Sequence, residues 1–177
     1  MPEYQYNCEA AVKKLHQGII EQESEIDKLL WDTLLVYQGY VFCTSSGLPF
    51  SYIVKRKRNG EYSGELLVSR KETSKTLTRS SVLLAFHKVI DAAQICDING
   101  KAELILPEYK GPKAIGQIFG ISYIYSIFWK FGLIRVPAKV QEKFSAAKAQ
   151  SEQEAEGLRA QLREQELTAK MNLSEAV

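Results

Sequence analysis

The sequence has few of the residues on which metal sites and disulfide frameworks depend. Among 177 residues there are three cysteines and two histidines. Cys8, Cys43 and Cys96 lie far apart and are odd in number, which argues against a disulfide framework and favours a reducing compartment. His16 and His87 each stand alone, so the sequence shows no Cys/His spacing typical of zinc sites. We therefore expect neither a bound metal nor a cofactor.

Catalytic and phosphate-binding motifs are incomplete. Residues 111–117 have the glycine spacing of a phosphate-binding loop, but the required Lys is missing and Pro112 removes a backbone amide. Ser145 and Lys148 match a Ser-x-x-Lys pattern, but they lie in a polar helical segment without the companion motifs of penicillin-interactive enzymes. We expect a non-enzymatic protein with no catalytic residues. The alternative is an enzyme whose site is assembled from residues distant in the sequence.

Uninterrupted hydrophobic runs are also missing. The N-terminus has no basic stretch followed by an apolar one, as a signal peptide would. The apolar run 114–134 approaches the length of a membrane span, but four polar residues interrupt it: Gln117, Ser122, Ser126 and Lys130. This pattern predicts a buried core helix rather than a span. We expect a cytoplasmic protein with no membrane partner.

Both ends of the chain are predicted to be helical. Apolar residues at spacings of three, four and seven predict one long helix over residues 8–38, ended by Gly39. Residues 138–177 are rich in Ala, Glu, Gln and Lys and predict a polar helical arm. The N-terminal helix is interpreted as a structural strut or, alternatively, as a dimer interface. A homodimer would form through these terminal helices.

The middle of the chain predicts strands and a capped helix. Strands over 40–44, 50–54 and 65–69 form an antiparallel meander, with a hairpin turn at Asn59-Gly60. Thr78 is the expected N-cap of a helix over 79–93. Asn99-Gly100 forms another turn, followed by a short strand over 104–106.

The fold class is therefore α+β, with a small antiparallel meander packed against helices and with long N-terminal and C-terminal helices. We expect residues 1–137 to form the globular domain. At its centre a helix over 112–131 packs against the helix 79–93. The largest core residues are expected to be buried together: Leu83, Phe86, Ile118, Phe119, Ile127 and Phe128.

One short motif in the central segment resembles part of a helix-turn-helix. Ile115 to Ser122 reads Ile-Gly-Gln-Ile-Phe-Gly-Ile-Ser, with the small residue, turn glycine and serine cap in the order of that motif. The following helix fits less well, because Tyr123, Ile124 and Phe128 are poor readers of base edges. The alternative is a plain core helix bent at Gly120. A DNA-reading helix requires Ser122 and Tyr123 to be accessible after a turn at Gly120.

Basic residues are concentrated in the middle of the chain. Residues 55–79 contain eight Lys and Arg against three Glu, whereas the whole chain has a net charge of +2. We expect these basic residues, which surround the predicted meander, to lie at the same end of adjacent strands. Such a patch is typical of phosphate-backbone binding. The candidate nucleic-acid-binding residues are Lys55, Arg56, Lys57, Arg58, Arg70, Lys71, Lys75, Arg79, Lys110 and Lys113.

The sequence thus favours a nucleic-acid-binding accessory or regulatory protein of a bacterial cell or its mobile elements, with DNA preferred over RNA. The alternative is a protein-interaction module, for example a small phage- or mobile-element-encoded inhibitor that docks a basic face on an acidic groove of a nucleic-acid enzyme. Both functions require the same basic patch, so the sequence alone does not separate them. A solvated charged hairpin that blocks edge-to-edge aggregation is the third interpretation.

Overall fold

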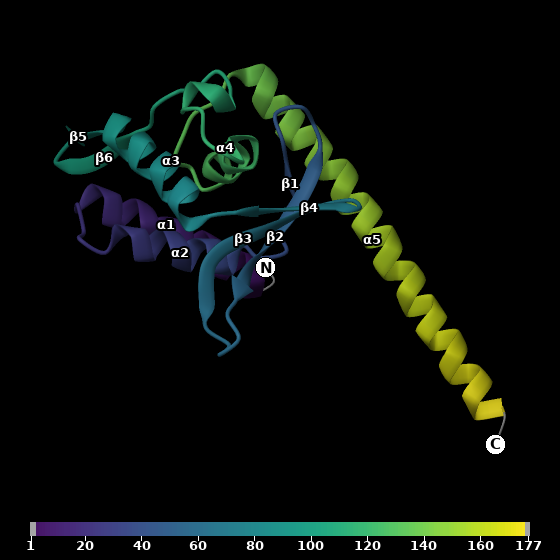
Figure 1. Ribbon diagram of the computed structural model, residues 1–177. Helices are drawn as coiled ribbons and strands as arrows, with labels where there is room; N and C mark the ends of the chain where they lie inside the picture. Colours follow the sequence, from purple (N-terminus) through teal and green to yellow (C-terminus); the bar gives the residue numbers. More distant parts are fainter. Residues whose placement is uncertain (1–2, 176–177) are drawn as a thin grey trace.

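A computed structural model describes residues 3–175 and shows helices packed around an antiparallel sheet, which confirms the predicted α+β class (Figure 1). The elements in chain order are α1 (Glu3–Ile20), α2 (Ile26–Val36), β1 (Phe42–Cys43), β2 (Pro49–Arg56), β3 (Tyr62–Arg70), β4 (Thr73–Leu77), α3 (Arg79–Ala92), β5 (Gln94–Ile98), β6 (Lys101–Ile105), the 3-10 turn η1 (Pro112–Ala114), α4 (Ile121–Lys130) and α5 (Ala138–Glu175).

The sheet has four strands in the order β1-β2-β3-β4, each antiparallel to its neighbour. Alternate residues of β3 are buried, and Val54, Leu66 and Leu77 are aligned across three strands on the face that packs on the core. The three predicted strands are confirmed, but β4 lies in a segment that was expected to be a loop. Its sequence is polar, and its turn with β3 uses Lys71 at a φ of 50° instead of a glycine.

The single helix predicted over residues 8–38 is wrong, because two helices occupy this region. Helix α1 ends in a pair of backbone hydrogen bonds, Glu23 N–H to Gly18 O at 3.0 Å and Gln22 N–H to Ile19 O at 3.2 Å. This is the Schellman arrangement, in which the residue after the cap takes a left-handed conformation. Gln22 does so with a φ of 53°. The chain therefore reverses, and α2 packs back against α1.

Helix α3 begins where the sequence predicted. The Thr78 hydroxyl accepts a hydrogen bond from the Ser81 amide at 3.3 Å, as an N-cap should. After α3, strands β5 and β6 form a separate hairpin around Asn99 and Gly100. Both turn residues have positive φ, 55° and 79°, which is the conformation that a two-residue hairpin turn requires.

The central helix is shorter than the predicted 112–131. Only η1 and α4 are helical in this segment, and between them the chain turns at Gly120, whose φ is 75°. A Cβ on Gly120 would overlap the Leu77 side chain, so this turn also places α4 close to the end of β4. Phe86, Ile118, Ile127 and Phe128 are buried as expected and Leu83 partly so, but Phe119 at the turn is 60% exposed.

The helix-turn-helix interpretation is also wrong. A turn at Gly120 does precede a separate helix, and Ser122 is exposed. However, a three-residue 3-10 turn stands where the first helix is required. Tyr123 is buried, with its ring edge-on against Phe50 at a centroid distance of 4.9 Å. The helix α4 is therefore part of the core rather than a reading helix.

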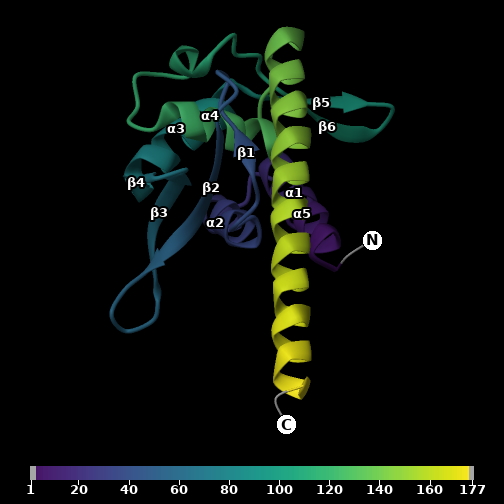
Figure 2. The same ribbon diagram turned by 90° about the vertical axis from the view of Figure 1, so that its right-hand side faces the viewer.

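Helix α5 begins in the core and then leaves it. Phe144, two turns into the helix, is 3% exposed and packs on Trp129 at a centroid distance of 4.9 Å. Further on, the helix extends past the rest of the molecule (Figures 1 and 2). The core thus reaches beyond residue 137 before the polar arm begins.

Candidate nucleic-acid interface

The β2–β3 hairpin projects from the body of the molecule, and we refer to residues 55–65 as the ribbon (Figures 1 and 2). Its turn is closed by backbone hydrogen bonds from Lys57 to Glu61 at 2.7 Å and from Gly60 to Lys57 at 3.0 Å. Gly60 has a φ of 88°, so the turn is the three-residue type that ends in a left-handed residue. The predicted hairpin at Asn59-Gly60 is thereby confirmed, with a longer turn.

Two of the four consecutive basic residues of the ribbon have acidic partners. Lys55 Nζ lies 3.2 Å from a Glu65 oxygen, and Lys57 Nζ lies 3.8 Å from a Glu61 oxygen. Both pairs are largely open to solvent, where an ion pair contributes little and competing anions can replace it. Arg58 is exposed and forms no ion pair with any described residue. The ribbon therefore carries more positive than negative charge at its tip.

Arg56 is held in a fixed orientation. Its guanidinium donates to the Gly60 carbonyl and to the Tyr62 hydroxyl, each at 2.8 Å. The same group lies 4.2 Å from the centre of the Tyr62 ring. Arg56 is exposed and Tyr62 is 40% exposed, so this cation–π pair faces solvent.

Arg79 forms a second pair of the same kind. Its guanidinium lies 5.0 Å from the centre of the Trp31 ring. Its stem passes Gly64, where an added Cβ would come within 3.2 Å of the Arg79 Cδ. Tyr62 and Gly64 are two residues apart on β3, opposite the register shift between Val54 and Arg56. Sequence reasoning identified Arg79 but missed Tyr62, Gly64 and Trp31, because their roles depend on contacts across elements.

The expectation that the basic residues around the meander lie at one end of the sheet is wrong. The ribbon turn follows β2, whereas Arg70 and Lys71 lie at the other end of β3, about 26 Å away for eight strand residues. Lys75 is on the edge strand β4 near this second turn. An antiparallel meander always places successive turns at opposite ends of the strand they share. Arg79 returns to the ribbon side because β4 leads back along β3.

Lys110 and Lys113 occupy a third location. They are exposed in the loop between β6 and α4. This loop lies at the top of the molecule in both views, whereas the ribbon tip lies toward the bottom (Figures 1 and 2). The ten candidate residues are therefore divided into a ribbon group, a β3–β4 group and a loop group. The ribbon group consists of Lys55, Arg56, Lys57, Arg58 and Arg79.

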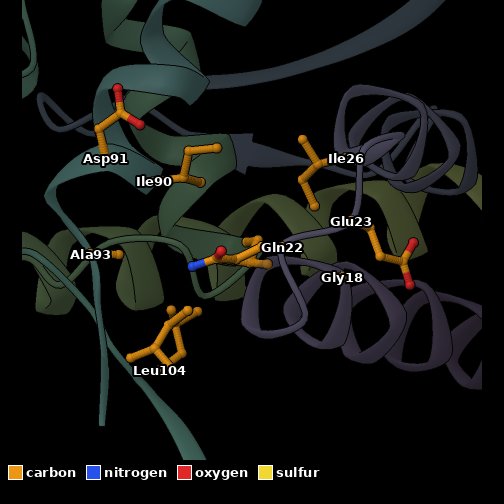
Figure 3. Close-up of a pocket in the computed structure, with 10 residues that line it drawn as sticks. Gly18, Gln22, Glu23, Ile26, Ile90, Asp91, Ala93 and Leu104 are labelled. Carbon is orange, nitrogen blue, oxygen red and sulfur yellow. The ribbon is translucent and has the colours of Figure 1, made fainter.

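A cleft away from the ribbon has a mixed polar and apolar lining. It has a volume of about 550 Å³ and lies between the α1–α2 turn, the end of α3 and the β5–β6 hairpin. Figure 3 shows the Gln22 side chain directed between Ile90 and Leu104, while Glu23 and Asp91 stand at the rim with their carboxylates turned outward. A smaller cavity of about 250 Å³, lined by aromatic residues of β1, α4 and α5, includes Cys43.

The groups with shifted pKa values lie in the core. Burial raises the pKa of the Cys43 thiol and of the Tyr109 hydroxyl. Burial, and secondarily the nearby Glu108 carboxylate, raises the pKa of Tyr125 to about 12. The Tyr125 hydroxyl donates to the Tyr109 carbonyl at 2.7 Å, which ties α4 to the chain that leads into it. The Tyr125 hydroxyl therefore serves the packing of α4.

Metal ligands do not gather in the part of the chain that the structure describes, where no group of three or more His, Cys, Asp and Glu residues could hold an ion. His87 lies 2.9 Å from an Asp27 oxygen, and this pair links α3 to α2. None of the helices among residues 3–175 is long and apolar enough to cross a bilayer.

Comparisons with protein-family models, with curated proteins and with solved structures gave no match to this chain.

Proposed function

We propose that this protein is a non-enzymatic nucleic-acid-binding accessory or regulatory protein that contacts its ligand through the ribbon. One observation carries the proposal: a basic hairpin projects from the body and presents Arg56, Lys57 and Arg58 to solvent (Figure 1). A projecting hairpin can approach a phosphate backbone without a clash from the rest of the molecule. Arg79, at the base of the ribbon, extends the same basic surface.

Charge supports a phosphate ligand over a neutral one. The exposed ion pairs of Lys55 and Lys57 leave these ammonium groups able to exchange partners, because surface pairs are weak. Each phosphate that displaces such a partner also releases counterions, which makes binding favourable at low salt. The β3–β4 and loop groups would act as secondary contacts for a longer nucleic acid. The terminal helices offer surfaces for a homodimer.

The test is the salt dependence of binding, measured by fluorescence anisotropy with duplex and single-stranded DNA between about 50 and 200 mM salt. The test variant is Lys57→Ala with Arg58→Ala. The matched control is Lys13→Ala with Lys14→Ala, which removes the same charge from exposed positions of α1. If both ribbon residues contact phosphates, the test variant should flatten the log–log slope by up to about two units, and the control should leave it unchanged.

If the ribbon variant and the α1 control show the same dependence of affinity on salt, the proposal is contradicted. The absence of DNA binding by the parent at low salt would also contradict it. In that case the ribbon serves an acidic protein surface instead, as an inhibitor of a nucleic-acid enzyme would use it. A pull-down with a purified acidic partner would then be affected by the ribbon variant and not by the α1 control. Melting temperatures should be similar throughout, because the four side chains are exposed.

A further inference from the structure

Two arginines at the ribbon and its base have their guanidinium groups against aromatic rings. Arg56 covers Tyr62 at 4.2 Å, and Arg79 covers Trp31 at 5.0 Å, measured from the guanidinium carbon to the ring centre. Both arginines are exposed. Each guanidinium therefore lies beside a ring and belongs to a side chain that is open to solvent.

The position of Arg56 suits stacking better than phosphate binding. Two of its five N–H donors are engaged by the Gly60 carbonyl and the Tyr62 hydroxyl, which fix the plane of the group. A phosphate contact needs donors that point outward, whereas a base needs a flat surface. Arg58 and Lys57, next to it, retain outward donors for the backbone.

We propose that this flank of the ribbon stacks unpaired bases on Arg56 and Arg79, so that the nucleic acid bound is single-stranded. The inference rests on the proposed function and specifies its ligand. Arg56 lies over Tyr62 and the stem of Arg79 passes Gly64, two residues further along β3, so both arginines lie near the same stretch of β3 and one strand can contact both with its bases. A duplex cannot, because its bases stack on each other and expose only their edges.

The test needs no variant in its first step. The parent protein is titrated with a strand of about 16 nucleotides, with the same strand in which the bases are replaced by abasic sites, and with the corresponding duplex. The base-containing and abasic strands have the same backbone charge, so the difference between their affinities reports contacts to the bases. Stacking on two platforms should make the base-containing strand bind at least roughly tenfold more tightly than the abasic strand.

The second step assigns the contact to Arg56. Arg56→Lys keeps the charge and removes the planar group, and Arg58→Lys makes the same change at the same tip away from any ring. Arg56→Lys should weaken binding of the base-containing strand roughly tenfold, with little effect on the abasic strand or the salt slope. Arg58→Lys should bind all ligands nearly as the parent does.

The outcomes separate this inference from the proposed function. Equal affinity for the base-containing and abasic strands, or tighter binding of the duplex, overturns single-strand stacking and leaves nucleic-acid binding in place. Equal losses in the two lysine variants overturn the role of Arg56. No binding of any of the three ligands at low salt overturns both proposals. If Arg56→Lys loosens the hairpin, the abasic comparison with the parent protein still decides.

Discussion

Arg79 on α3 lies over the indole ring of Trp31 on α2, with its guanidinium carbon 5.0 Å from the ring centre. This contact joins the N-terminal helical hairpin to the base of the ribbon. It is feasible because β3 has a glycine, Gly64, where the Arg79 stem passes. The three residues come from three different elements.

The first prediction concerns this glycine. Gly64 has a φ of 80°, which costs other residues about 1–2 kcal/mol, and an added Cβ would press on the Arg79 stem. Gly64→Ala should therefore lower the free energy of unfolding in urea by more than Gly47→Ala. Gly47 is the matched control, because it has a φ of 86° and open space around it. Equal losses of unfolding free energy in the two variants would mean that the Arg79 side chain moves away from the added Cβ without a loss of stability.

The second prediction concerns the core. Phe128 is fully buried, so Phe128→Ala should cost about 3–5 kcal/mol of unfolding free energy. Phe119 is 60% exposed only nine residues earlier, and Phe119→Ala should cost less than about 1 kcal/mol. Chemical denaturation of the parent and both variants measures these differences in unfolding free energy. A loss below about 1 kcal/mol for Phe128→Ala would show that α4 is not the centre of the core.

The third prediction concerns the end of α1. Gln22 occupies a left-handed position that glycine prefers, at a cost of about 1–2 kcal/mol. Glycine also adds about 0.5–1 kcal/mol of unfolded-state entropy, so the expected net gain for Gln22→Gly is about 0.5–1 kcal/mol. Gln22→Ala, the control, retains the left-handed strain and should give no gain. A melting temperature for Gln22→Gly below that of the parent would contradict this account.

The fourth prediction concerns alkaline pH. The pKa of Tyr125 is raised to about 12, so the unfolded chain loses this proton at lower pH than the folded one. Its contribution to stability is complete below about pH 10, the unfolded value, and is lost as the pH rises toward 12. The loss should approach roughly 2–3 kcal/mol.

Urea unfolding at a series of pH values from about 9 to 12 would measure this loss. Tyr125→Phe removes the titrating hydroxyl together with its hydrogen bond to the Tyr109 carbonyl. The variant should therefore be less stable at neutral pH and show a weaker decline above pH 10. Parallel declines for the variant and the parent would assign the alkaline effect to other groups, such as Tyr109 and Cys43, whose pKa values are also raised.

The fifth prediction concerns the C-terminal arm. Every side chain described between residues 160 and 172 is exposed, whereas Phe144 is buried against Trp129. Removal of residues 150–177 should therefore leave the melting temperature nearly unchanged. Phe144→Ala in the full-length chain should lower the unfolding free energy by about 3–5 kcal/mol. A large drop on truncation would show that the arm packs on the body or on a second copy.

Local sequence determined the features that depend on neighbouring residues. The Thr78 cap, the turns at Asn59-Gly60 and Asn99-Gly100, and the polar helix after residue 138 each follow from the residues within them. The α+β class followed from combining these elements. Even so, β4 and β5 were not predicted, because β4 is polar and its turn lacks glycine and asparagine.

Tertiary contacts decided the rest. The seven-residue spacing from Ile19 to Ile26 favours one helix across the polar residues 21–25, but packing of α2 against α1 stabilises a reversal there at Gln22, whose φ is positive. An apolar segment that could continue as helix turns instead at Gly120, where the positive φ and the Leu77 side chain beside it leave no room for a Cβ. The candidate interface was divided for a topological reason: the length of β3 separates two basic turns that are close in the sequence, and the return of β4 brings Arg79 back to the ribbon. Residue spacing gives the period of an element and caps or turn residues mark some of its ends, whereas packing partners decide the other ends and which face is buried.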